Sequence, residues 1–167
     1  LKNKKAKGMI NGPISKDKFL KKKFPGITEY LARKTKSNET AMLIYNKKLS
    51  VSPLTTHLPL KKVVKNINKQ KIIKHINLIE NFYKKILKKK PKIAILGLNP
   101  HCETTDKTSE EKTEIIPAIN YLKKKKIKIS GPFSADTFFL KQNIKDFDVV
   151  VGMYHDQVLT PLKTIFE

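Results

Sequence analysis

Three of the four histidines in this 167-residue sequence follow stretches that look like buried strands. His57 follows "LSVSPLTT", His101 follows "KIAILGL" after a short Asn-Pro step, and His155 follows "DVVVGM" with one tyrosine between. Imidazole is the commonest neutral metal ligand, and catalytic zinc sites use three protein ligands and leave a position open for substrate. The wide separations in sequence rule out a local finger and fit ligands that separate strands deliver. The pattern therefore predicts a metal site.

The same three histidines have a simpler explanation as polar loop residues without a ligand. Judged by spacing alone, polar loop residues are the commoner explanation. The shared position after strands makes the metal site a stronger competitor, but the loop explanation still leads. The fourth histidine, His75, lies within a lysine-rich helical segment. We expect His75 to be an ordinary surface or boundary residue.

Polar neighbours add further candidates for chemistry. Asp156 directly follows His155, where a carboxylate can orient an imidazole or take part in proton transfer; a helix cap is the alternative. Lys163 can meet a phosphate or carboxylate as a point charge. In "NGPISK" a glycine and a proline let the backbone approach a ligand, and Lys16 is a candidate cation or a solvated lysine at a helix start.

The elements that position these residues alternate between apolar runs and amphipathic segments. We predict strands at 8–10, 40–45, 49–55, 92–98, 127–130 and 148–153. We predict helices at 15–22, from Thr28 as N-cap, over 60–87 with a break near Asn68, and over 110–126 with Ser109 as cap and a bend at Pro117. This alternation predicts an α/β sheet covered by helices, with ligand chemistry at the carboxyl ends of the strands.

Composition indicates a globular chain with enough apolar residues for a core, since 39% of the residues are hydrophobic. The sequence has neither an apolar run near 20 residues nor the apolar stretch of a signal peptide at its start, so we expect a cytoplasmic protein without a membrane partner. The single cysteine, Cys102, excludes an internal disulfide and agrees with a reducing compartment. Because the chain begins at leucine, we expect a piece of a longer protein.

The net charge of +22 suggests a nucleic-acid partner at first sight. However, Arg33 is the single arginine among 36 basic residues, whereas base reading and bidentate phosphate contacts favour the guanidinium group. The lysines form scattered runs on predicted helix faces, which favours solvated surface and no nucleic-acid partner. A lysine-rich nucleic-acid-binding domain remains the rival hypothesis, and a steep loss of duplex affinity with salt would identify it.

The motifs "GPISK", "PGITEYLA", "TTHLPL", "GLNPH", "SGPFSADTFF" and "MYHDQVLTPLK" occur in this order along nearly the whole chain. Together they resemble the signature segments of the 4-hydroxythreonine-4-phosphate dehydrogenase family of pyridoxal 5'-phosphate (vitamin B6) biosynthesis. The resemblance implies an α/β/α sandwich like that of isocitrate and isopropylmalate dehydrogenases, here incomplete at both ends. It favours the metal explanation of the three histidines.

The resemblance also implies an activity and a set of site residues. The family oxidises 4-phosphooxy-L-threonine with NAD or NADP, and decarboxylation then gives 3-amino-2-oxopropyl phosphate. Its members are homodimers with an active site shared between subunits, and a divalent metal (zinc, magnesium or cobalt) is held by histidines that match His57, His101 and His155. Substrate contacts of the family match Ile27, Thr28 and Lys163, and Asp156 and Lys163 are the expected catalytic groups.

Two departures from the family pattern bear on these expectations. Ile27 stands where the family usually has histidine, and "CETTDKTSEE" replaces the usual glycine-rich loop after "NPH". A related dehydrogenase of another phosphorylated hydroxy acid is therefore an alternative. We expect residues 1–167 to be the central part of a longer two-domain chain without an internal boundary, and to be inactive when isolated.

Overall fold

The computed structural model describes residues 9–10, 12–15, 24, 26–37, 39–103 and 105–166, apart from the side chain of Glu29. The chain divides into two compact units, Leu1–Thr40 and Ala41–Glu167. The predicted helix at 15–22, with Lys16, lies outside the described residues beyond Ser15, as does Gly8 of the predicted strand at 8–10. Met9 and Ile10 are described and are not in a strand.

The first unit contains one described helix, α2 (Ile27–Thr35). Its N-cap is Gly26 with an extended backbone, so the prediction that Thr28 caps the helix is wrong; the helix starts one residue earlier than the threonine. It ends at Thr35, and the following residue, Lys36, is left-handed and donates its N–H to carbonyl groups of the last turn. The guanidinium of Arg33 lies 5.5 Å from the ring centre of Phe24, a cation–π contact within this unit.

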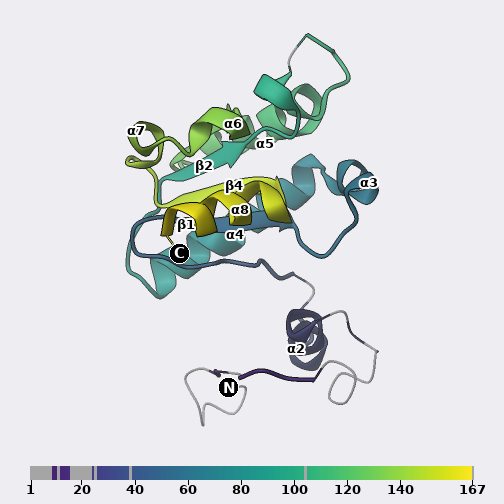
Figure 1. Ribbon diagram of the computed structural model, residues 1–167, viewed down its shortest axis with the longest axis vertical. Coiled ribbons are helices and arrows are strands. Elements are labelled where there is room, and N and C mark those ends of the chain that lie inside the picture. Colours follow the sequence, from purple (N-terminus) through teal and green to yellow (C-terminus); the bar gives the residue numbers. More distant parts are fainter. Residues whose placement is uncertain are drawn as a thin grey trace. The chain divides into compact units, whose positions relative to one another are not determined.

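The second unit is built on four parallel strands in the order β1-β4-β2-β3 (Figure 1). The strands are β1 (Ser50–Thr55), β2 (Ile93–Leu96), β3 (Ile129–Phe133) and β4 (Val149–Tyr154). The helical elements are α3 (Leu60–Val63), the 3-10 helix η1 (Val64–Asn66), α4 (Lys69–Lys85), the 3-10 helix η2 (Pro100–Cys102), the π-helix η3 (Glu111–Ile115), α5 (Ile116–Lys124), α6 (Ala135–Phe138), α7 (Lys141–Ile144) and α8 (His155–Phe166).

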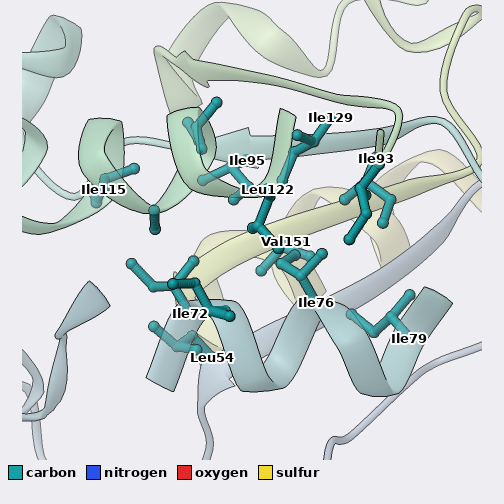
Figure 2. Packing of buried hydrophobic residues seen from close by; sticks show 14 of the residues in the cluster. Leu54, Ile72, Ile76, Ile79, Ile93, Ile95, Ile115, Leu122, Ile129 and Val151 are labelled. Carbon is teal, nitrogen blue, oxygen red and sulfur yellow. The ribbon is translucent and has the colours of Figure 1, made fainter. Parts of the chain in front are cut away.

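Helices cover both faces of the sheet because alternate strand residues point to opposite sides. One face buries Ile93, Ile95, Val149 and Val151 against α4 and α5, as Figure 2 shows for several of these side chains. The opposite face buries Val51, Ala94, Leu96 and Val150 against α6 and α8. In Figure 1, α8 passes in front of the sheet and α4 lies behind it. The predicted α/β/α arrangement of layers is confirmed.

The break predicted near Asn68 is confirmed, and its cause is local. The side chain of Asn68 accepts a hydrogen bond of 2.8 Å from the N–H of Lys71, which makes it the N-cap of α4. The following apolar residues recur every three or four positions, so they form one stripe that faces the sheet. This stripe consists of Ile72, Ile76, Ile79 and Tyr83.

Two other predicted elements differ from the structure. Segment 40–45 is not a strand, because its only strand-like pairing is an isolated antiparallel bridge between Ile44 and Val51. Ser109 is not a side-chain cap, since its hydroxyl is buried and makes no hydrogen bond within the described residues. The helical region starts with the π-helix η3, which continues directly into α5, and Pro117 is the second residue of α5.

None of the helices in the described part of the chain has the length and apolar character needed to cross a membrane.

The expectation of a surface position for His75 is also wrong. Only 6% of the side chain is exposed, and its Nε2 lies 2.7 Å from the Ser52 hydroxyl. Since Ser52 donates its hydroxyl hydrogen to the Met42 carbonyl, His75 must carry hydrogen on Nε2 and act as the donor. Burial and, as a smaller contribution, the positive charge of Lys71 together lower the pKa of His75 from 6.5 to about 4.

This buried histidine predicts a pH-dependent loss of stability. Below pH 6.5 the unfolded chain takes up a proton at His75, whereas the folded chain does so only near pH 4, so protonation favours unfolding. We expect the free energy of unfolding to fall across this interval by about 3 kcal/mol more in the wild type than in His75→Gln, whose amide can still donate to Ser52. Urea unfolding at a series of pH values measures the free energy of unfolding of both proteins. If it depends on pH equally in both, His75 does not have the lowered pKa.

Candidate active site

The candidate ligands lie along one edge of the sheet because all four strands are parallel and therefore end on the same side. His57 follows the end of β1, His101 follows β2, and His155 follows β4 as the first residue of α8. All three have exposed or half-exposed side chains, whereas His75 is buried in the middle of α4. In open α/β sheets, ligands bind in the crevice outside the carboxyl ends of the strands.

His57 and His155 lie side by side because β1 and β4 are paired neighbours. Their ring centroids are 6.1 Å apart and the ring planes differ by 38°. The Thr55 hydroxyl donates a hydrogen bond of 2.7 Å to the Met153 carbonyl and ties the two strand ends together. The two imidazoles line a cavity of about 240 Å³, which Tyr154 and Asp156 also line.

Asp156 orients the imidazole of His155. Its Oδ1 lies 2.7 Å from Nδ1 of that ring. An ionised carboxylate only accepts hydrogen bonds, so Nδ1 carries the hydrogen and Nε2 keeps a free lone pair. The carboxylate also lies in the first turn of α8, where a negative charge interacts favourably with the helix dipole.

His101 faces a second aspartate across the next strand end. Its Nδ1 lies 3.6 Å from Oδ2 of Asp136, which is too long for a hydrogen bond but close enough for charge attraction when the ring is protonated. The Ser134 hydroxyl, 2.5 Å from Oδ1, lowers the pKa of Asp136, and His101 lowers it further. His101 lines a cavity of about 370 Å³, and Tyr154 borders both this cavity and the one beside His57.

The donor set fits a divalent metal ion in part. Two imidazoles that share one ion through bonds of about 2.0–2.1 Å have ring centroids roughly 5–6 Å apart, close to the separation of His57 and His155. In both His101 and His155, Nδ1 points at an aspartate, and such a pairing is typical of metal-binding histidines. Among the described residues of one chain, however, no three His, Cys, Asp or Glu side chains converge as a complete site.

The structure does not bring the other predicted site residues together with the three histidines. Lys163 is an exposed residue of α8, about 12 Å along the helix axis from His155 at 1.5 Å per residue. Ile27 and Thr28 form the first turn of α2, with Ile27 half-buried and Thr28 exposed. They belong to the unit Leu1–Thr40 and are described within that unit alone.

Sequence reasoning missed two buried polar residues behind the histidines. Gln157 bridges the ends of β2 and β4 with hydrogen bonds of 2.7 Å to the Gly97 carbonyl and the Met153 N–H. Glu111 is fully buried and accepts hydrogen bonds from the loop after β2. A signal for Glu111 exists, because it lies on the same helical stripe as Ile115 and Leu122 and must therefore face the interior.

The fold is that of the open α/β proteins, a class in which ligands bind outside the carboxyl ends of the strands, where the three histidines lie here. Comparison with known families then shows that the chain belongs to the family described as pyridoxal phosphate biosynthetic protein PdxA, whose model matches residues 1–166. The fold agrees with a crystal structure of 4-hydroxythreonine-4-phosphate dehydrogenase from Klebsiella pneumoniae. The TM-score is 0.78 at 34% identity, and the match covers 86% of this chain and 44% of that one.

Curated relatives carry two different names. A 4-hydroxythreonine-4-phosphate dehydrogenase from Sulfurihydrogenibium sp. is 46% identical over 166 residues, which cover 97% of this chain and 51% of the relative. A D-threonate 4-phosphate dehydrogenase from Pectobacterium atrosepticum is 36% identical over 143 residues, 85% of this chain and 44% of the relative. The chain thus spans about half the length of the curated relatives that it matches.

The Asp156 contact predicts which tautomer His155 adopts. In the wild type we expect neutral His155 to carry its hydrogen on Nδ1, because Asp156 Oδ1 accepts from that atom. Asp156→Ala removes the acceptor and should shift the population toward the Nε2-protonated form, which is the more stable tautomer of free imidazole. Long-range ¹H–¹⁵N NMR of the ring nitrogens measures this shift. An Nε2-protonated ring in the wild type would contradict the assigned contact.

Proposed function

We propose that the protein is a metal-assisted, NAD- or NADP-dependent dehydrogenase that oxidises 4-phosphooxy-L-threonine in pyridoxal 5'-phosphate biosynthesis. The observation that carries this proposal is the pair of imidazoles 6.1 Å apart at the carboxyl edge, with His155 oriented by Asp156. Membership of the PdxA family and the name of the relative at 46% identity support the substrate. Decarboxylation of the oxidised product then gives 3-amino-2-oxopropyl phosphate.

In this proposal His57, His101 and His155 hold a divalent ion, which is zinc, magnesium or cobalt. When bound, the ion supplies a Lewis acid that favours deprotonation of the substrate hydroxyl and stabilises the negative charge left by loss of carbon dioxide. We further propose a homodimer in which the ligands come from both subunits. A shared site accords with the single chain, in which His57 and His155 are neighbours while His101 faces the adjacent cavity.

The remaining residues bind and orient in this proposal. Asp156 holds the hydrogen of His155 on Nδ1, keeps Nε2 directed outward, and is exposed enough to accept or release a proton at the cavity. Lys163 supplies a point charge for the substrate phosphate or carboxylate, and the Thr28 hydroxyl is a further substrate contact. A bound nicotinamide cofactor would supply the acceptor for the hydride of the substrate carbon, and a basic group would take up the hydroxyl proton.

The direct test is turnover of the protein expressed from its complete reading frame. We expect NADH or NADPH formation from 4-phosphooxy-L-threonine in the presence of zinc, magnesium or cobalt. His57→Ala and His155→Ala should each lower turnover on the order of a hundredfold or more, because a first ligand is lost. His75→Gln serves as the control, since it changes a histidine outside the edge. Full turnover in the two alanine variants would overturn the metal assignment.

A second candidate function is oxidation of D-threonate 4-phosphate. The relative of that name at 36% identity supports it, as does Ile27, which replaces the histidine expected at a substrate contact. The two substrates differ in the amino group, so loss of one polar contact bears on the choice between them. The ratio of kcat/KM for the two substrates decides, and a higher value for D-threonate 4-phosphate would replace the first proposal.

Ile27 gives a separate prediction about substrate binding. If the protein binds substrate without the usual histidine, Ile27→His should leave the KM for 4-phosphooxy-L-threonine equal or lower, since a polar contact is added. Ile27→Val is the matched control, because it keeps an apolar side chain at the same position. A large loss of turnover in correctly folded Ile27→His, with Ile27→Val unaffected, would show that isoleucine shapes a different pocket.

A further inference from the structure

We propose that Glu111 and Gln157 form a buried polar clamp on residues 97–99, and that this clamp positions His101. The inference rests on the proposed function, because it matters for catalysis only if His101 holds the metal ion. Within the described residues, neither clamp side chain makes a hydrogen bond or an ion pair with a proposed ligand. Glu111 and Gln157 act through the backbone that leads to His101, so they are positioning residues.

Glu111 holds the start of the loop that leads to His101. One carboxylate oxygen accepts hydrogen bonds from the N–H of Leu98 at 2.7 Å and of Asn99 at 2.8 Å. The other oxygen accepts from the Asn99 side-chain amide at 2.8 Å. The side chain is fully buried, and a buried carboxylate is tolerated only when donors replace the lost water. These three donors fix the loop backbone two residues before His101.

Gln157 joins the same loop to the helix that begins with His155. Its Nε2 donates to the Gly97 carbonyl at 2.7 Å, and its Oε1 accepts from the Met153 N–H at 2.7 Å. The side chain is 8% exposed, so water does not compete effectively for either bond. Because Gln157 lies two residues after His155 in α8, a shift of the helix is transmitted to the end of β2.

The loop after β2 has a conformation that needs such support. His101 has φ 53° and Cys102 has φ 56°, so two successive residues with side chains adopt the left-handed region. Non-glycine residues persist in that region only where surrounding contacts determine the backbone strongly. Glu111 supplies those contacts directly ahead of the strained pair. The clamp therefore accounts for how a candidate ligand is held in an unfavourable backbone conformation.

Two glycines, one directly after β2 and one within β4, leave room for the clamp. A Cβ added to Gly97 would lie 3.1 Å from Glu111 Oε1 and 2.7 Å from Cys102 Sγ. A Cβ added to Gly152 would lie 2.9 Å from Gln157 Oε1 and 2.5 Å from Val158 Cγ1. The 3.1 Å distance is tighter than most real Cβ contacts, and the other three distances are shorter than real Cβ atoms show. The two glycines thus let the polar side chains approach the strand ends closely.

The test measures cobalt binding to the protein from its complete reading frame, by visible absorbance of the bound ion. Glu111→Gln keeps the shape of the side chain but turns one acceptor oxygen into a donor group. Gln157→Met keeps the length and removes both hydrogen bonds. We expect each variant to bind cobalt about 10–100-fold more weakly, as do variants that disturb the support of metal ligands. The double variant should lose less than the two single effects combined, because both act on residues 97–99.

Glu114→Gln is the matched control for a merely structural effect. Glu114 lies in the same π-helix, but its carboxylate accepts from the Lys69 N–H at the start of α4 and has no bond to the loop. We expect this variant to lower the thermal midpoint while leaving cobalt affinity unchanged. Equal cobalt affinity in the wild type, Glu111→Gln and Gln157→Met would overturn the clamp, provided that His57→Ala and His155→Ala still lose cobalt. Retention of cobalt by the two histidine variants would instead overturn the proposed function.

A measurement on the wild type keeps the proposal testable even if Glu111→Gln fails to fold. Amide hydrogen exchange should show strong protection for the N–H groups of Leu98, Asn99 and Met153. Each of these groups donates a hydrogen bond to a clamp side chain. The N–H of Thr108 is the comparison, since it bonds only to the exposed side chain of Asp106. Exchange of the three clamp amides as fast as that of Thr108 would contradict the clamp.

Discussion

Parallel pairing of the central strand β4 with both β1 and β2 is the constraint on which the rest of this unit depends. Val149 is in register with Ser50 on one side and with Ile93 on the other, so the first residues of these three strands are aligned across the sheet. Parallel neighbours require crossover connections, and these place α4 and α5 on one face of the sheet. The same constraint brings every strand to its end at one edge, where His57, His101 and His155 follow.

Both faces of the sheet are buried, so the backbone N–H and C=O groups at the carboxyl ends of the strands need hydrogen-bond partners. Thr55 and Gln157 use the two backbone groups of Met153, and Glu111 uses the amides that leave β2. These interior bonds let the histidines remain at the surface while their backbones are fixed. A rigid base below exposed ligands is what a site needs if it is to hold a metal and a substrate in defined geometry.

The sequence predicts β2 and β4 because continuous apolar runs mark strands that are buried on both faces. It predicts β1 because apolar residues there alternate with polar ones, and it predicts the break before α4 because Asn68 is a capping residue. It failed for the partners of buried polar groups. His75 was expected at the surface, yet its partner Ser52 lies 23 residues away on a strand that the helix covers. Glu111 likewise meets Leu98 across a loop. Pairings of this kind depend on how the chain folds back, and no local pattern encodes them.

The central claim is that three histidines at one sheet edge hold the metal of a PdxA-family dehydrogenase. X-ray absorption of the zinc-loaded protein, expressed from its complete reading frame, tests this most directly. If the three histidines bind the ion, its first shell has three imidazole nitrogens at about 2.0–2.1 Å, together with their outer-ring scattering, and His101→Ala loses one imidazole. A shell of oxygen ligands, or an imidazole count that does not change in His101→Ala, would contradict it.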